Sequence, residues 1–235
     1  MKSSMQEKYE KEFKRYFSEV EFRTKIYNKA RQDTDPYMAS NFNVFDYIAP
    51  NENKLSDIFA DLLNPRGKHG QGGIFLKIFL KQIHHEKEEN LDYCQVVRES
   101  QTTWISNNRR RIDILLRFKE GFVVAIENKP WSTEQENQLQ DYHEHLIKKY
   151  KKDNCLVYMS GNGVTPTSIE PKKQRILQRD REFEVLNYAS GVVAWLEEGY
   201  KECQAEKIRY FLRDLIVYIK KNFDSVDESG ENCAE

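Results

Sequence analysis

Residues 109–129 read RRRIDILLRFKEGFVVAIENK, and this stretch carries the main signal for the architecture of the chain. Two runs of Ile, Leu, Val and Phe flank the polar segment 119–121, which is the pattern of two strands joined by a tight loop. Three ionisable residues interrupt the apolar runs, namely Asp113, Glu127 and Lys129. A charge among apolar side chains needs a compensating partner, such as an opposite charge or a metal ion. The stretch therefore predicts a β-hairpin that carries chemistry.

The register of this hairpin determines whether the charges meet. Glu127 and Lys129 share one face, because side chains alternate along a strand. A two-residue turn would put Asp113 opposite Asn128, on the wrong face for Glu127. A three-residue loop, with Gly121 at its left-handed third position, would put Asp113 opposite Glu127. In that register the two carboxylates have Cβ atoms about 5 Å apart, and such a pair of oxygen ligands suits Mg²⁺ or Mn²⁺.

Two carboxylates on a divalent cation beside a lysine are suited to hydrolysis of a phosphodiester. The cation polarises the phosphate and lowers the pKa of water, and the ammonium orients that water or stabilises the developing charge. The alternative is that Asp113, Glu127 and Lys129 are exposed residues on a solvated sheet face. An acid followed by Glu-x-Lys does not by itself distinguish a catalytic site from a solvated sheet face. The surrounding sequence has to distinguish them.

At this point the chain resembles the PD-(D/E)XK nuclease superfamily, whose pattern is an acid at the end of one strand and (D/E)-x-K on the next. Asp113 supplies the first acid and residues 127–129 read Glu-Asn-Lys. Ile112 replaces the proline that names the motif, which is a common departure in this group. The segments 51–57 and 62–65 also look like a bacterial and phage subfamily of small members.

Two further elements match the resemblance. The family usually carries an acidic residue on a helix ahead of the hairpin, and Glu52 fits in type and order. Gln138 and Tyr142 resemble the Q-x-x-x-Y signature of the exonuclease-like branch, and their i, i+4 spacing puts them on one helical face. Glu52 is also favoured simply by the dipole at a helix start, and the other two could be ordinary polar residues of a helix face.

The resemblance implies a role for each matched residue. The implied metal ligands are Asp113, Glu127, the backbone carbonyl of Asn128, and Glu52, while Lys129 is the catalytic ammonium and Glu52 completes or tunes the metal shell. The candidates for nucleic-acid contact are Gln138, Tyr142, Arg109, Arg110, Arg111 and His69. A loop histidine such as His69 is more often a hydrogen-bonding residue, and arginine runs are often solvated.

Hydrophobic periodicity predicts where the helices and strands lie. Strands are expected at about 94–104, 111–118, 122–129, 154–160 and 183–188, and helices at about 51–63, 74–84, 134–150, 190–198 and 205–223. Three strands followed by a helix and another strand indicate an α/β fold with a mixed sheet. The expected fold is restriction-endonuclease-like, with a mixed central β-sheet flanked by helices and with helical additions at both ends.

The expected domain organisation is a single nuclease domain over residues 1–223. Within it, residues 1–48 form an N-terminal helical extension, 49–160 the catalytic core and 161–223 a C-terminal strand and helices. Residues 224–235 are expected to be a disordered tail.

Composition excludes several classes of protein. Over 235 residues, 37 Lys and Arg face 38 Asp and Glu, so the formal net charge is −1 and the chain is not histone-like or polybasic. The longest apolar run falls far short of a membrane span, so we expect no membrane partner and a cytoplasmic location. The four cysteines form no C-x-x-C pair, which argues against a zinc knuckle or a disulfide framework.

The sequence thus predicts a Mg²⁺-dependent nuclease, with Mn²⁺ able to substitute, acting on DNA more readily than on RNA. The expected mechanism is direct attack by metal-activated water without a covalent intermediate. Restriction, phage defence or phage DNA processing is a role drawn from the subfamily resemblance alone. The alternative is a catalytically silent nuclease fold that binds nucleic acid or a protein partner. A homodimer or higher homo-oligomer stays open.

Overall fold

The computed structural model describes residues 4–86, 91–105, 109–132, 134–151, 153–161, 163 and 165–223. The chain divides into two compact units, Met1–Asn43 and Val44–Glu235. The first unit contains α1 (Ser4–Met38), which exposes aromatic side chains such as Tyr9, Phe13 and Phe17. The expected tail at 224–235 lies outside the described residues.

The second unit alternates helices and strands. Its helices are α2 (Val44–Ile48), α3 (Glu52–Leu63), α4 (Ile74–Gln82), η1 (Leu91–Tyr93), α5 (Gln138–Tyr150), α6 (Pro171–Arg179), η2 (Tyr188–Val192), α7 (Val193–Glu202) and α8 (Glu206–Phe223). Its strands are β1 (Gln95–Gln101), β2 (Arg111–Arg117), β3 (Val123–Lys129), β4 (Asn154–Ser160) and β5 (Phe183–Asn187). Among the described residues, no helix is both long and apolar enough to cross a membrane.

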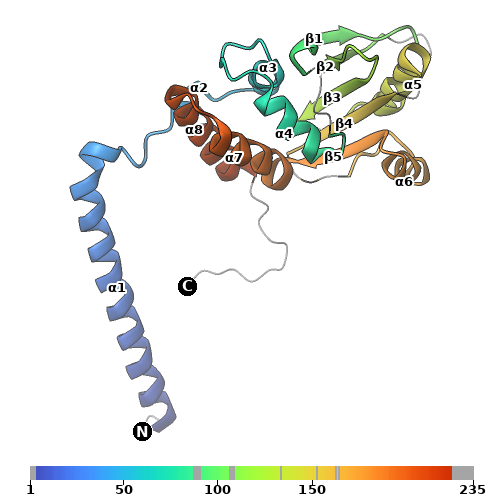
Figure 1. The fold of residues 1–235 in the computed structure, drawn as a ribbon. Helices are drawn as coiled ribbons and strands as arrows, with labels where there is room; N and C mark the ends of the chain where they lie inside the picture. The colour runs from blue at the N-terminus through green and yellow to red at the C-terminus, as the bar shows by residue number, and fades with distance from the viewer. Residues whose placement is uncertain are drawn as a thin grey trace. The chain divides into compact units, whose positions relative to one another are not determined.

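The strands form one mixed five-stranded sheet in the order β1-β2-β3-β4-β5 (Figure 1). The first three strands are antiparallel neighbours, and β3, β4 and β5 run parallel. The helix α5 connects β3 to β4, as a parallel pair requires a crossover. The predicted α/β fold with a mixed sheet is therefore confirmed.

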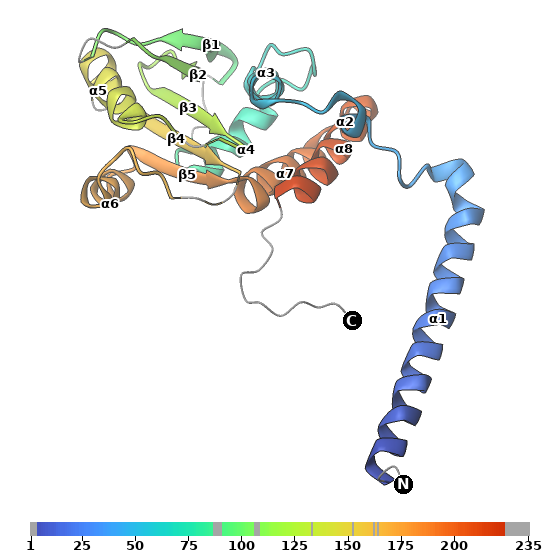
Figure 2. The same cartoon turned by 180° about the vertical axis from the view of Figure 1, so that it is seen from behind.

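Helices cover both faces of the sheet (Figures 1 and 2). On one face, Ile114, Val124 and Ile126 belong to a core shared with α3, α4, α7 and α8. On the other, Leu115 and Ala125 pack with residues of α5 and α6. Alternate residues of one strand thus enter opposite cores, which explains why β3 reads as an almost unbroken apolar run. Leu115 of β2 and Val123 and Ala125 of β3 lie in the core that α5 covers, and Ile112 lies there too, so the alternation of β2 breaks between Ile112 and Ile114.

The β2–β3 hairpin adopts the three-residue register. Ile114 pairs with Ile126, and the Phe118 amide donates to the Phe122 carbonyl at 3.0 Å. Gly121 has φ 95°, a left-handed conformation that residues with a side chain rarely adopt. The pairing ends at Ile114–Ile126, and Asp113 and Glu127 are the next residues beyond it.

The helix α3 begins where the sequence predicts. Asn51 is its N-cap, and its side-chain oxygen accepts a hydrogen bond from the Lys54 amide at 2.9 Å. Glu52 is the first helical residue, and Leu55 and Phe59 bury the inner face completely. Glu52 therefore lies at the N-terminal end of α3.

Two elements differ from the prediction. The helix α6 (Pro171–Arg179) is not among the expected helices, because its segment is strongly polar and only Gln174 and Leu177 are buried. The helix α5 begins at Gln138 rather than near residue 134, since Asn137 has φ 57° and starts the helix from a left-handed conformation. The preceding loop instead passes in front of the open end of the hairpin.

Candidate active site

The hairpin opens at the end where its acids lie. The β2–β3 ladder stops at the Ile114–Ile126 pair. Beyond it, the Asn128 amide donates a hydrogen bond to Oδ2 of Asp113 at 2.8 Å, so a side chain takes the place of a backbone partner. Burial raises the pKa of Asp113, and nearby Glu52 adds to this, while the Asn128 amide and Lys129 oppose it.

Glu127 is the most deeply buried carboxylate of the site, with 1% of its surface exposed. Its Oε1 accepts from Gln138 Nε2 at 2.6 Å and lies 2.8 Å from Lys129 Nζ. Its Oε2 has no hydrogen-bond partner among the described residues. Burial first and the Asp113 carboxylate second raise the pKa of Glu127 to about 8. An ionised Glu127 therefore lacks compensation for one oxygen.

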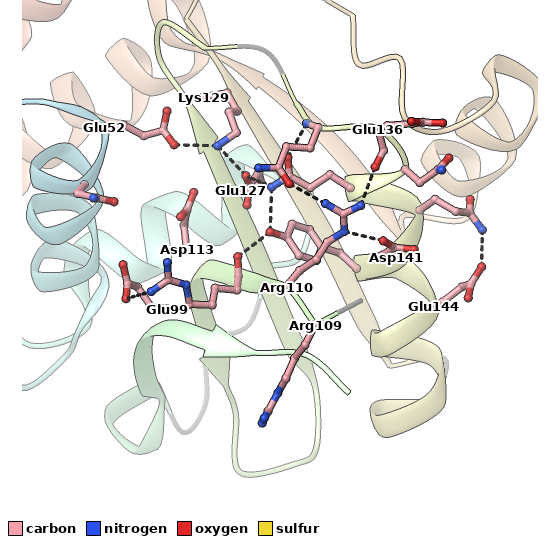
Figure 3. A pocket seen from close by; sticks show the side chains of 17 residues that line it. Glu52, Glu99, Arg109, Arg110, Asp113, Glu127, Lys129, Glu136, Asp141 and Glu144 are labelled. Carbon is pink, nitrogen blue, oxygen red and sulfur yellow. Dashed lines mark hydrogen bonds and ion pairs between the residues drawn. The ribbon is translucent and has the colours of Figure 1, made fainter. Parts of the chain in front are cut away.

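Lys129 lies between two carboxylates (Figure 3). Its Nζ is 2.7 Å from Oε1 of Glu52 and 2.8 Å from Oε1 of Glu127. Burial disfavours the charged amine, but the two carboxylates outweigh burial and raise the pKa of Lys129. Ser132 donates to the other oxygen of Glu52 at 2.6 Å. Sequence reasoning missed Ser132, because a loop serine carries no pattern.

A buried polar network holds the residue between the two charges of β3. The Asn128 side chain is fully buried and donates to Ser56 Oγ at 2.9 Å. It also accepts from the Tyr188 hydroxyl at 2.6 Å. Asn128 could therefore contact a metal only through its backbone carbonyl, as the sequence predicts. Nothing in the sequence pattern connects Tyr188 with this site.

Glu52, Asp113, Glu127 and Lys129 line an open cleft of about 820 Å³. Seven acidic and four basic side chains are among the residues that line it (Figure 3). The acidic ones are Glu52, Glu99, Asp113, Glu127, Glu136, Asp141 and Glu144, and the basic ones are Arg109, Arg110, Arg111 and Lys129. The cleft thus has an excess of negative charge, and an anionic substrate would enter it only with additional cations.

Gln138 and Tyr142 meet on one face of α5, as predicted, but both are buried, with 7% and 1% of their surfaces exposed. The amide of Gln138 donates to Glu127 and, at 3.0 Å, to the Tyr142 hydroxyl. That hydroxyl donates to the Arg111 carbonyl at 2.6 Å. The pair therefore orients Glu127, and its polar atoms are engaged within the protein.

The three consecutive arginines line the cleft in different ways. The guanidinium of Arg110 is half-buried and bonds Asp141 at 2.5 Å, Gln135 at 2.9 Å and the Glu136 carbonyl at 2.6 Å. Arg109 and Arg111 are exposed, and Arg111 pairs with Glu99 at 3.1 Å. Arg110 thus holds the loop before α5, while the other two side chains extend toward solvent.

His69 is not brought to the cleft. It is buried, with Nε2 2.9 Å from the Asn64 carbonyl oxygen, and its Nδ1 accepts from the Gln71 amide at 3.0 Å. This pattern assigns the hydrogen to Nε2, because the other nitrogen accepts. The ring also contacts Phe75 edge-on. Both nitrogens of His69 are therefore used to fix its own loop.

The residues present fit a divalent cation. Oε2 of Glu127 is a buried carboxylate oxygen without a partner among the described residues, and Asp113 is close enough for its charge to raise the pKa of Glu127. Burial and the Glu52 carboxylate raise the pKa of Asp113, and burial and the Asp113 carboxylate raise the pKa of Glu127. A bound cation would oppose both shifts. Among the described residues, no three His, Cys, Asp or Glu side chains already converge as a metal site. Lys129 separates Glu52 from Glu127.

A family profile matches residues 42–215, and its description is the PD-(D/E)XK nuclease superfamily. The chain belongs to this superfamily. The resemblance seen in the sequence is thereby confirmed, and the matched range runs from just before α2 into α8. Searches of curated proteins and of solved structures each found no significant match.

Membership of the PD-(D/E)XK superfamily indicates a nuclease, and these nucleases generally use divalent metals. In this member the acid of the first strand is Asp113, and the Glu-x-Lys of the second strand is residues 127–129. Ile112 in place of the usual proline is fully buried, packs in the same core as Leu115 and lies within β2. The departure from the motif thus leaves the strand in place.

Proposed function

We propose that this protein is a metal-dependent nuclease that hydrolyses phosphodiester bonds, of DNA more readily than of RNA. The observation that supports the proposal is the open end of the hairpin, where the Asn128 amide donates to Asp113 at 2.8 Å and Lys129 lies 2.8 Å from Glu127. Two carboxylates and an ammonium then face one open cleft. Burial disfavours the ionised form of both carboxylates, and a bound cation would compensate for it.

Asp113, Glu127 and the Asn128 carbonyl would hold Mg²⁺ or Mn²⁺, with Glu52 as a further oxygen ligand. When bound, such a cation polarises a phosphate and lowers the pKa of water, which is the chemistry that phosphodiester hydrolysis needs. Oxygen ligands at the end of a strand pair suit these hard cations. The excess of acidic side chains in the cleft supports the requirement for a cation, because phosphates would otherwise be repelled.

Lys129 acts in this proposal as a charged group that orients the attacking water and stabilises negative charge on the phosphate. Its raised pKa keeps the amine protonated at neutral pH, so it serves as an electrostatic group and not as a general base. Gln138 holds Oε1 of Glu127, which leaves Oε2 for a ligand. Arg109 and Arg111, both exposed at the cleft, contact substrate phosphates.

The test is cleavage of supercoiled plasmid, linear duplex and an RNA of matched length, each with Mg²⁺, with Mn²⁺ and with EDTA. We expect cleavage of DNA with either cation and none with EDTA. Asp113→Asn and Lys129→Met should abolish it. Lys119→Met is the matched control, because Lys119 lies in the loop at the opposite end of the same hairpin, where it packs over Tyr93.

Two outcomes would contradict the proposal. Full cleavage by both active-site variants would show that the activity arises elsewhere. A wild-type protein that binds DNA without cutting it under any cation would favour the silent binding module, and Mn²⁺ calorimetry would then show no heat of binding. Faster cleavage of RNA than of DNA would retain the site but correct the substrate.

A further inference from the structure

Arg98 connects three points of the molecule around the site. It lies on β1 opposite Ile114, so its side chain leaves the sheet on the face that α3 covers. Its Nε donates to Oδ1 of Asp57 at 3.0 Å, and one terminal nitrogen donates to the Asn53 carbonyl at 3.3 Å. The other terminal nitrogen donates to the backbone carbonyl of Asp113.

These contacts join the two elements that carry separate acids of the cleft. Asn53 directly follows Glu52, and Asp57 lies one turn further along α3. Asp113 belongs to β2. The side chain of Arg98 is only 22% exposed, so water screens its bonds less than those of a surface pair. One guanidinium thus bonds the start of α3 and the strand position of Asp113 at the same time.

Apolar packing alone would leave the placement of Glu52 less defined. The inner face of α3 packs through Leu55 and Phe59, and such contacts are non-directional. A planar guanidinium with three engaged nitrogens adds directional bonds between α3 and β2, beside the bond that Asn128 of β3 makes to Ser56 of α3. Partial burial works against a charged Asp57, but Arg98 and Lys54 lower its pKa, so the Arg98–Asp57 pair is ionised at neutral pH.

We propose that Arg98 is a positioning residue of the nuclease, setting the separation of Glu52 and Asp113 by bonding α3 and β2 together. The inference rests on the proposed function for its consequence, because the carboxylates matter as cation ligands. The contact itself does not depend on the proposed function. Arg98 is not among the residues that line the cleft, so its effect reaches the chemistry through the placement of Glu52 relative to Asp113.

The decisive variants are Arg98→Lys, which keeps the charge but cannot make the three-point contact, and Asp57→Ala, which removes only one of the bonds on α3. We expect each to lower kcat by about 10- to 100-fold, as loss of residues supporting metal ligands commonly does. The Mn²⁺ concentration for half-maximal rate should rise about 10-fold, and KM for DNA should stay unchanged. The double variant should be little worse than Arg98→Lys alone, because both changes break one connection.

Arg117→Lys is the matched control, since Arg117 is an exposed residue at the far end of β2. A second readout does not depend on activity. Hydrogen exchange of the metal-free protein should become faster at the amides of residues 52–57 in Arg98→Lys, with the thermal midpoint within a few degrees of wild type. Asp57→Ala provides the test if Arg98→Lys fails to fold.

Each result decides one of the two proposals. Unchanged exchange at 52–57 together with an unchanged Mn²⁺ titration would overturn the role of Arg98. A uniform loss of stability, with exchange faster throughout the sheet, would assign Arg98 a structural role and also overturn it. A wild-type protein that neither binds Mn²⁺ nor cleaves would refute the proposed function, while the exchange data would still report whether Arg98 holds α3.

Discussion

The backbone amide of Asn128 donates a hydrogen bond to the carboxylate of Asp113 at 2.8 Å, directly past the last pair of the β2–β3 ladder. The contact replaces a strand-to-strand bond by a strand-to-side-chain bond. It directs the Asp113 carboxylate toward the backbone of β3, one residue past Glu127. The site exists because the hairpin stops pairing before its strands end.

Replacing Asp113 by asparagine should separate chemistry from folding. The amide oxygen can still accept the Asn128 hydrogen bond, but the negative charge is lost. We expect cleavage to fall more than about 100-fold, because loss of a direct ligand should cost at least as much as loss of its supporting contacts. The measurement is a Mg²⁺-dependent cleavage rate at saturating DNA.

In the absence of metal, the Asp113→Asn variant should be at least as stable as wild type. A carboxyl whose pKa is raised by burial favours the folded state only while it is neutral, so stability is lost as pH rises through that pKa. The side-chain amide of the Asp113→Asn variant does not titrate, so its thermal midpoint should fall less than that of wild type as pH rises above 3.8, the ordinary pKa of an aspartate. A steeper fall in the variant would contradict the burial of Asp113.

Removing the Tyr142 hydroxyl should disturb Glu127 through Gln138. Tyr142→Phe takes away the acceptor of the 3.0 Å bond from Gln138 and the donor of the 2.6 Å bond to the Arg111 carbonyl. We expect a stability loss of about 1–2 kcal/mol from the unpaired carbonyl. The cleavage rate should fall about 10-fold, because Gln138 is less constrained.

Tyr150→Phe is the control on the same helix. The hydroxyl of Tyr150 is buried and has no hydrogen-bond partner among the described residues, so its removal should be neutral or slightly stabilising. Urea unfolding of both variants measures the difference. Equal stability losses in Tyr142→Phe and Tyr150→Phe would contradict the contacts assigned to Tyr142.

Gly161 follows β4 beside the site, and a side chain there should be damaging. An added Cβ would lie 1.7 Å from the Pro130 carbonyl oxygen and 2.8 Å from a ring carbon of Phe223. The Gly161 amide also donates to the Lys129 carbonyl at 3.0 Å. Gly161→Ala must therefore shift the backbone next to Lys129, with a cost of about 2 kcal/mol or more and a loss of cleavage.

The comparison for Gly161 is Gly73→Ala. An added Cβ at Gly73 meets nothing nearer than Leu91 Cβ at 3.2 Å, which a small movement of the neighbour relieves. We expect a change of less than about 1 kcal/mol there. Thermal unfolding of both variants distinguishes them, and a Gly161→Ala protein as stable as Gly73→Ala would show that the close approach of Pro130 is wrong.

His145 should make the protein less stable in mild acid. Its Nδ1 accepts from the Thr103 amide at 2.9 Å and its ring is fully buried, so protonation would break that bond and bury a charge. Burial first, and Lys149 second, lower the pKa of His145 from 6.5 to about 4. The unfolded chain then binds the proton first, so stability is lost as pH falls below about 6.5.

The expected loss from His145 is on the order of 2 kcal/mol between pH 7 and pH 5. His145→Gln, which keeps an acceptor for Thr103 but does not titrate, should lack this part of the pH dependence. His84 is exposed, and His84→Asn is the control, which should retain this pH dependence of stability. Guanidinium unfolding at both pH values provides the measurement. Parallel pH profiles for wild type and His145→Gln would refute this assignment.

Much of the fold could be predicted because its signals are local. The N-cap at Asn51, the apolar face of α3 and the runs of β2 and β3 each depend on neighbours in the chain. Gly121 also favours the three-residue loop, because its left-handed conformation suits that turn. The helix α6 escapes prediction since its sequence is mostly polar and buries few side chains.

The roles of the polar residues around the acids could not be predicted in the same way. Arg110 and Gln138 are candidates for contact with nucleic acid in the sequence, yet their polar atoms bond Asp141 and Glu127 inside the protein. His69 stands in a glycine-rich loop but serves that loop. Which partner a polar side chain meets depends on elements far away in sequence, and no local pattern encodes that distance.

The strands, the N-cap of α3 and the candidate charges Asp113, Glu127 and Lys129 could be predicted from the amino-acid order alone, because propensity and side-chain alternation act over a few residues. How these three are held depends on the folded chain. Glu52 reaches Lys129 from 77 residues away, and Arg98 connects α3 to β2 across 41 and 15 residues. Such contacts join segments that lie far apart in the chain, so their geometry depends on the fold as a whole.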